Sequence, residues 1–142
     1  MLENSLRILK HKGVTGFVIA LYYLAKANIY RRLLGQRYLK KKIFNYWMWL
    51  DTLDRGIGRT LILFGQREED HRIILQKVLK PGMTVLDIGA NIGYYAMMER
   101  ELVGETGRII AVEPAQGNIA TLKRNVALNG YQNIDFFHMA IS

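Results

Sequence analysis

The sequence has 142 residues, half of them hydrophobic, which suits one globular core of modest size. It contains no cysteine, which excludes disulfides and thiolate chemistry, and His11, His71 and His138 lack metal-ligand spacing, so no metal is expected. The formal net charge is +8, but the first 50 residues hold ten Lys/Arg against one acid, whereas the rest hold ten against eleven. This asymmetry fits either a solvated basic helix face or an anionic partner such as a membrane surface, nucleic acid or acidic glycan.

The N-terminal segment, residues 6–34, has a mostly helical pattern with interruptions near Gly13 and Gly16, and Gly35 is the expected end of the helix. Its apolar run, residues 14–25, is shorter than the roughly 20 residues of a spanning helix. No convincing signal-peptide cleavage site follows the run. We therefore expect a packed helix or one lying in a membrane interface, in a protein that is cytoplasmic or peripheral to a membrane.

The middle of the chain carries mixed signals. The aromatic-rich stretch after Lys42 favours a strand or hairpin arm with Trp47 and Trp49 on one face. The acids before Ile73 occupy the first turn of an expected helix, where the helix dipole favours them. In chain order we predict a basic connector (37–42), the strand or hairpin arm (43–53), turns and a short apolar element (54–65), and a helix (67–79) with Ile73, Ile74, Val78 and Leu79 buried.

The last 60 residues alternate between short apolar runs and amphipathic segments. Strand, helix, strand, helix, strand is the pattern of a parallel sheet, so the predicted class is α/β and Rossmann-like. The expected elements are strands at 84–89, 107–114 and 133–142, with helices at 91–104 and 118–130. We divide the chain into a basic helical N-terminal extension (1–42), a lead-in hairpin and helix (43–80), and a domain portion (81–142).

The turn after the first of these strands is glycine-rich and follows a single acid, Asp87. Gly89 allows a sharp turn, and Gly93 removes a side chain where a helix must pack closely. Ligands of parallel sheets bind beyond the carboxyl ends of the strands, where a helix N-terminus offers free N–H groups. A carboxylate at Asp87 suits a zwitterionic amino-acid moiety better than a diphosphate. Glu113 ends the next strand, near the offset at which an acid binds ribose hydroxyls.

These motifs resemble a known family. "VLDIGANIGYY" followed by "IIAVEPAQGNIATLKRNVALNG" is similar to class I S-adenosylmethionine-dependent methyltransferases, most of all to the FkbM-like subfamily, which also carries an Asn at the position of Asn118. The lead-in from Tyr46 to Asp70 and the closing "HMAIS" resemble the same family, so the resemblance covers about residues 46–142. The first 40 residues resemble no family that we can name.

The resemblance implies S-adenosylmethionine as cofactor. The methionine end of the cofactor would contact Asp87, Gly89, Ala90, Asn91 and Gly93. Its ribose would contact Glu113, and its adenine would lie beside the turn around Met139, Ala140 and Ile141. Glu68 or Glu69 could close the site, although an acid at a helix start is the simpler interpretation. The family's sheet has seven strands ordered 3-2-1-4-5-7-6, and this chain ends after the third. We therefore expect the N-terminal portion of a methyltransferase domain, with one side of its first strand exposed as an unpaired edge.

The implied reaction transfers a methyl group to an oxygen, and the resemblance points to a hydroxyl of a sugar, glycan or natural product. The catalytic residues stay unknown, because they would lie in the later strands. Two alternatives stay open. A nicotinamide-dependent oxidoreductase would also use Glu113, but the loop lacks the Gly-x-Gly-x-x-Gly spacing. A basic membrane- or nucleic-acid-associating module, with a vestigial cofactor site, would use residues 1–42. Nucleic acid is not the expected partner, because the sequence carries no RNA-binding signature.

Overall fold

The computed structural model describes residues 2–141, which divide into two compact units. The first unit holds residues up to Phe44 and Trp49–Arg67, and the second holds Asn45–Met48 and the chain from Glu68 onward. The element order is α1 (Leu2–Arg32), β1 (Tyr38–Ile43), β2 (Tyr46–Asp51), α2 (Ile57–Phe64), α3 (Glu69–Val78), β3 (Thr84–Ile88), α4 (Tyr94–Val103), β4 (Arg108–Val112), α5 (Gln116–Leu128) and β5 (Ile134–Phe137).

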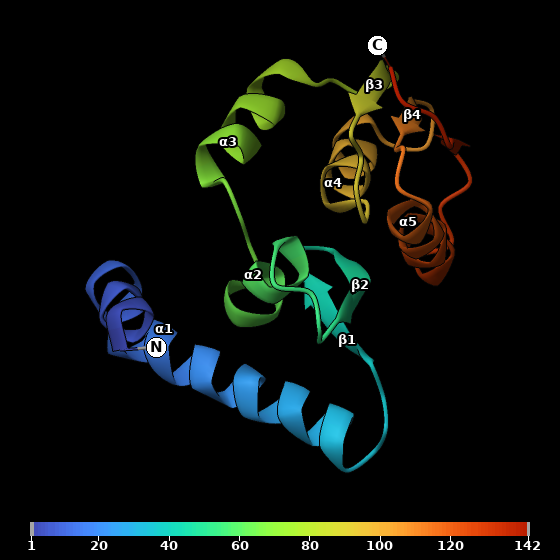
Figure 1. Cartoon of the computed structure of the whole chain (residues 1–142). Helices are drawn as coiled ribbons and strands as arrows, with labels where there is room; N and C mark the ends of the chain where they lie inside the picture. Colours follow the sequence, from blue (N-terminus) through green and yellow to red (C-terminus); the bar gives the residue numbers. More distant parts are fainter. Residues whose placement is uncertain (1, 142) are drawn as a thin grey trace. The chain divides into compact units, whose positions relative to one another are not determined.

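Helix α1 dominates the first unit (Figure 1). It runs through the predicted helical segment and is kinked at Gly13, whose φ of 66° is left-handed, so the predicted interruption is confirmed there. No break occurs at Gly16, which has ordinary helical geometry. None of the helices within residues 2–141 has the length and apolarity needed to cross a bilayer.

The stretch predicted to be a basic connector is strand β1, so that prediction was wrong. The two-residue period of a strand turns Lys40 and Lys42 outward and buries Lys41 between Leu39 and Ile43. The buried ammonium donates a hydrogen bond to the carbonyl of Ile62, at 2.6 Å. Because that acceptor lies in a later helix, the local sequence gave no sign that a lysine could be inside.

The predicted hairpin arm is strand β2, which pairs with β1. Tyr46, Met48 and Leu50 are buried, so Trp47 and Trp49 share the other, more exposed face, as predicted. The short apolar element that follows is helix α2, whose first turn is capped by Asp54. Its two carboxylate oxygens accept the backbone N–H groups of Gly56 and Gly58, each at 2.7 Å.

The second unit is built on a three-stranded parallel sheet in the order β3-β4-β5, with α4 and α5 beside it (Figure 1). The register pairs Asp87 with Ala111 and Ala111 with Phe136, which confirms the predicted alternation of strands and helices. Ile109, Ala111 and Val112 of the central strand are buried, as are Met97 of α4 and Leu122 of α5.

One long side of strand β3 is unpaired within the described chain, and Leu86 and Ile88 on it are more than half exposed. This confirms the expected open edge. The predicted buried face of α3 is wrong, because Ile73, Ile74 and Val78 are all exposed. No element among residues 2–141 covers that face, which is why its apolar pattern does not produce a core.

Candidate cofactor site

The loop between β3 and α4 is held in a tight, left-handed path. Gly89 has φ 81°, Asn91 φ 52° and Gly93 φ 91°. The backbone N–H groups of Gly89 and Ala90 both donate to the carbonyl of Val112 at the end of β4, at 2.8 and 3.0 Å. The loop is therefore fastened across the carboxyl ends of two neighbouring strands, where parallel sheets bind their ligands.

The two glycines of this loop serve different purposes. A Cβ on Gly93 would lie 2.4 Å from Cδ1 of Leu122, so this position must be bare for α5 to pack, although the sequence had suggested the following helix α4 as the neighbour. A Cβ on Gly89 would meet nothing within 4 Å. Gly89 thus meets a conformational need, and the space beside its backbone is open to a ligand.

Glu113 follows β4 directly and is only 5% exposed. Its Oε2 accepts the backbone N–H of Asn91 at 2.9 Å. Its Oε1 accepts the N–H of Ala115 at 2.9 Å and the side-chain amide of Asn118 at 3.1 Å. The carboxylate therefore ties the loop to the start of α5. Oε1 thus uses both of its lone pairs, whereas Oε2 keeps one, with which it could accept one further hydroxyl donor.

Asp87 lies on β3, immediately before the loop. Its carboxylate accepts a hydrogen bond from the backbone N–H of Ala96, yet its buried Oδ2 has no partner among the described residues. Burial and, after it, the charge of the nearby Glu113 raise the pKa of Asp87, and His71 acts in the opposite direction, so that the pKa is about 6. A buried carboxylate oxygen without a donor is uncommon and indicates a place for one more polar group.

The start of helix α3 contributes Glu68, which the sequence analysis named as able to close the site, and His71, which the sequence did not connect with it. The hydroxyl of Tyr95 donates a hydrogen bond to Oε2 of Glu68, and the ring of His71 lies 4.5 Å, centroid to centroid, from that of Tyr95. His71 is thereby close enough to influence the pKa of Asp87. Nothing in the spacing of these residues connects His71 to Asp87, because the connection runs through α4.

Glu99 is a second buried acid on this side of the unit and was not noticed in the sequence. It is 6% exposed, and its Oε2 has no hydrogen-bond partner within residues 2–141. Burial raises its pKa to about 8, and the charge of Asp87 adds to the increase. Glu99 is therefore mainly protonated at neutral pH, whereas Asp87 is mainly ionised.

The turn after β5, expected beside the adenine, is exposed, and Ala140 makes no contact that defines a ligand position. One ring atom in this turn is fixed: Nε2 of His138 lies 3.0 Å from the carbonyl oxygen of Pro114, which makes Nε2 the donor. The assignment of Ala140, like that of the other six cofactor residues, stays a prediction. The described residues contain no group of His, Asp or Glu side chains that could hold a metal ion.

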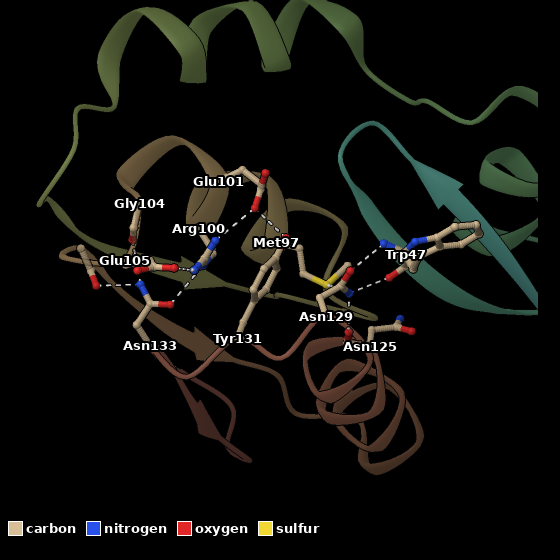
Figure 2. A network of polar contacts seen from close by, with 11 residues as sticks. Trp47, Met97, Arg100, Glu101, Gly104, Glu105, Asn125, Asn129, Tyr131 and Asn133 are labelled. Carbon is tan, nitrogen blue, oxygen red and sulfur yellow. Dashed lines mark hydrogen bonds and ion pairs between the residues drawn. The ribbon is translucent and has the colours of Figure 1, made fainter.

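A separate polar network lies at the opposite, amino ends of the strands (Figure 2). The guanidinium of Arg100 lies 4.1 Å from the ring centroid of Tyr131, whose hydroxyl donates to Glu101 at 2.6 Å. The side-chain amide of Asn133 donates to the carbonyls of Gly104 and Gly107. These groups satisfy one another, so the network is structural and leaves the carboxyl ends of β3 and β4 as the candidate site.

The residues at that end suit S-adenosylmethionine on chemical grounds. The unpartnered Oδ2 of Asp87 could accept a hydrogen bond from an ammonium group, and the bare backbone at Gly89 leaves room for one. Oε2 of Glu113 keeps one lone pair for a ribose hydroxyl. The donor set thus fits a nucleoside joined to an amino acid better than it fits a diphosphate, which two nearby acids would repel.

Comparison with known proteins agrees with this chemistry. Residues 71–140 match the family described as Protein-L-isoaspartate(D-aspartate) O-methyltransferase (PCMT). The protein-L-isoaspartate O-methyltransferase of Methanosarcina mazei is 43% identical over 56 residues, which are 39% of this chain and 23% of that protein. That of Methanococcus maripaludis strain C5 is 25% identical over 127 residues, 87% of this chain and 58% of that protein. Against the M. maripaludis enzyme and two others, this chain spans 26–58% of the relative's length.

Solved structures share the fold. The TYW2 protein of M. jannaschii in complex with AdoMet superimposes with a TM-score of 0.57 at 17% identity, over 73% of this chain and 43% of that one. A SAM-dependent O-methyltransferase from Thermotoga maritima gives 0.50 at 19% identity, over 54% and 29%.

The second unit is therefore a partial Rossmann-like domain of the class I S-adenosylmethionine-dependent methyltransferase type. Within that class, the matched family is PCMT and not the FkbM-like subfamily suggested by the motifs.

Proposed function

We propose that this chain is the cofactor-binding part of an S-adenosylmethionine-dependent O-methyltransferase. The observation that carries the proposal is the placement of Asp87, the Gly89–Gly93 loop and Glu113 at the adjoining carboxyl ends of β3 and β4. When bound, the cofactor supplies an electrophilic methyl group on a sulfonium. The chain's own residues hold and orient it. Asp87 would accept a hydrogen bond from the ammonium, and Oε2 of Glu113 one from a ribose hydroxyl, while Glu113 also fixes the loop through Asn91.

For the acceptor, we propose a carboxylate of a damaged aspartyl residue in a protein. The match of residues 71–140 to the isoaspartate O-methyltransferase family supports this choice over the sugar, glycan or natural-product hydroxyl suggested by the FkbM-like resemblance. A carboxylate is already ionised at neutral pH, so its methylation needs alignment of the two reactants and no base to remove a proton. A hydroxyl acceptor would need such a base.

The cofactor proposal is tested by calorimetric titration of the chain and three variants with S-adenosylmethionine. Asp87→Asn and Glu113→Gln should each lower the affinity at least tenfold, because each removes a charge-assisted hydrogen bond to the ligand. Glu105→Gln is the matched control, since its side chain is 90% exposed and lies at the other end of the strands. Equal affinities in all four proteins would contradict the assigned site.

The acceptor proposal is tested with methyl-labelled S-adenosylmethionine and three acceptors: an isoaspartyl peptide, its normal aspartyl counterpart and an oligosaccharide. Because the chain is only the cofactor-binding part of such an enzyme, we expect any label that is transferred to appear in the isoaspartyl peptide alone. Label in the oligosaccharide would support the hydroxyl alternative instead. Absence of transfer to all three, with cofactor binding intact, would refute methylation by this chain and leave it a binding domain.

The nicotinamide alternative has less support, because Asp87 precedes the loop and would repel a pyrophosphate. The vestigial-site alternative predicts no cofactor binding at all. The titration therefore separates both alternatives from the proposed function.

A further inference from the structure

Helix α1 is apolar on two faces, only one of which is used within the first unit. Ala20 and Ala27 are buried, and Leu24 and Ala27 line the side of the helix that faces α2 and the 52–55 loop. Their spacing of three, four and seven residues is that of one helix face. This inward face accounts for the packing of α1 but for fewer than half of its large apolar residues.

The opposite face carries a second set of apolar residues, which we call the outward stripe. Its large members recur at helical spacing and are between 49% and 78% exposed: Val14, Val18, Leu21, Tyr22, Ile29 and Leu33. From Val14 to Ile29 the stripe runs for about 22 Å along the helix, at 1.5 Å per residue, and Leu33 lies in the turn that follows. Scattered exposed apolar side chains are ordinary, whereas a continuous stripe of this length indicates an interaction surface.

The surroundings of the outward stripe are cationic. Residues 4–50 contain no acid, and Lys26 lies at the stripe's edge, 6.0 Å from the ring centroid of Tyr22. Arg32 follows Ile29 by three residues, so it lies on the same side of α1 as the stripe, and its side chain is exposed.

Neither Lys26 nor Arg32 forms an ion pair with an acidic side chain in the part of the chain that the structure describes. Both cations are therefore available to an external anion.

We propose that α1 lies in the interface of an anionic phospholipid bilayer, with the outward stripe at the acyl boundary and the surrounding cations at the lipid phosphates. An apolar stripe flanked by Lys and Arg is the pattern of helices that lie in a membrane interface. A second copy fits less well, because pairing two stripes would bring Lys26 and Arg32 of both copies together. The inference rests on the first unit alone and is independent of the cofactor proposal.

The binding test uses the full chain and vesicles of phosphatidylcholine, with or without 30% phosphatidylserine. We expect the chain to float with the anionic vesicles, and a triple variant, Val18→Ser/Leu21→Ser/Ile29→Ser, to bind them at least tenfold more weakly. The matched control is Ile73→Ser/Ile74→Ser, which removes exposed apolar side chains from α3 in the second unit and should bind like the parent. Far-UV circular dichroism verifies that all variants keep their helices.

The charge is tested separately. Lys26→Gln/Arg32→Gln should weaken binding to anionic vesicles by about fivefold per cation removed. Lys77→Gln/Lys80→Gln makes the same change in charge in the second unit and should have little effect. Raised salt should also weaken the binding of the parent chain to anionic vesicles.

Insertion is read from a single label, because the chain has no cysteine of its own. An environment-sensitive dye on Val18→Cys should shift to the blue with anionic vesicles, and the same dye on Lys77→Cys should not. The proposal is overturned by absence of flotation, by equal binding to neutral and anionic vesicles, or by equal loss in the control variant. It is also overturned if the Val18→Cys dye shifts without vesicles as the protein self-associates, which would make the partner a second copy.

Discussion

The two units of this chain treat buried charge in opposite ways. In the first, the ammonium of Lys41 donates to the carbonyl of Ile62 and lies 3.5 Å from the ring centroid of Tyr23. In the second, Asp87 and Glu99 each keep one buried oxygen without a partner among residues 2–141. A structural charge is surrounded by groups that satisfy it, whereas a charge placed for a ligand keeps some of its bonding capacity. The comparison locates the candidate site in the second unit without reference to sequence motifs.

The largest effect that we expect is a pH dependence set by Glu99. Its pKa is about 8 in the folded chain, above its ordinary value of 4.5, because it is buried and lies near Asp87. The folded chain therefore binds the extra proton, and the resulting stability is full below about pH 4.5 and is lost as the pH rises through 8. At about 1.4 kcal/mol per pKa unit, the free energy of unfolding should fall by a few kcal/mol between pH 5 and 8.5.

Urea unfolding at a series of pH values measures this dependence. Glu99→Gln should remove most of it, leaving the smaller contribution of Asp87, which is lost between about pH 4 and 6. Glu105→Gln, at an exposed position, should keep the parent's slope. If the free energy of unfolding fell equally steeply with pH in Glu99→Gln and in the parent, Glu99 would not be a protonated buried acid.

The second prediction concerns the fit of the loop against α5. Gly93→Ala should cost about 3 kcal/mol, from the clash with Leu122 and from the left-handed φ. Gly130→Ala shares the positive φ but has open space, so it should cost only about 1 kcal/mol. Chemical unfolding measures both, and Gly93→Ala/Leu122→Ala should lose less stability than the sum of the two single variants, because the clash is relieved. A loss no greater than that of Gly130→Ala would contradict the close approach.

The third prediction concerns Asn129, which fastens residue 47 to the second unit (Figure 2). Its side chain accepts the N–H of Trp47 at 2.7 Å and donates to the carbonyls of Trp47 and Asn125 at 2.8 and 2.7 Å. Asn129→Ala should cost about 2 kcal/mol and accelerate hydrogen exchange of the Trp47 amide. Gln132→Ala, which removes one exposed bond of 3.3 Å, should change little. Unchanged exchange at Trp47 would refute the bridging role.

The smallest predicted effect concerns Lys41 in the first unit. Burial lowers the pKa of Lys41 to about 8, and the charge of Lys26 acts in the same direction. Because the folded chain binds fewer protons than the unfolded chain between pH 8 and 10.5, stability should rise across this range. The gain should be about 1 kcal/mol once solvent screening is allowed for. Lys41→Met should remove this rise in stability with pH, whereas Lys42→Met, on the outer face of β1, should keep it. A free energy of unfolding that falls between pH 8 and 10.5 would contradict the lowered pKa of Lys41.

The sequence was most informative where local chemistry decides the structure. The alternation after residue 81 follows from short apolar runs and glycine turns, and the open edge of β3 follows from the number of strands. The need for glycine at position 93 was also predictable, although its neighbour, Leu122, lies in a later helix than expected. Asp87 and Glu113 were found because each ends a strand, and the ends of parallel strands meet.

The features that the sequence did not reveal depend on distant partners. Lys41 is buried because the carbonyl of Ile62 reaches it from α2, 21 residues away. His71 approaches Asp87 because its ring packs on Tyr95, which lies on α4. The apolar face of α3 stays exposed because no described element covers it. For Lys41 and His71 the neighbour that determines the surroundings lies far along the chain, and for α3 none of the described residues supplies one.

The most direct test of the central claim is calorimetric titration of the unmodified chain with S-adenosylmethionine and, separately, with NAD⁺, at pH 7.5 and at pH 5. We predict one binding site for S-adenosylmethionine at pH 7.5, a weaker one at pH 5 because Asp87 becomes protonated below about pH 6, and no binding of NAD⁺. Preference for NAD⁺, or failure of S-adenosylmethionine to bind at either pH, would contradict the account.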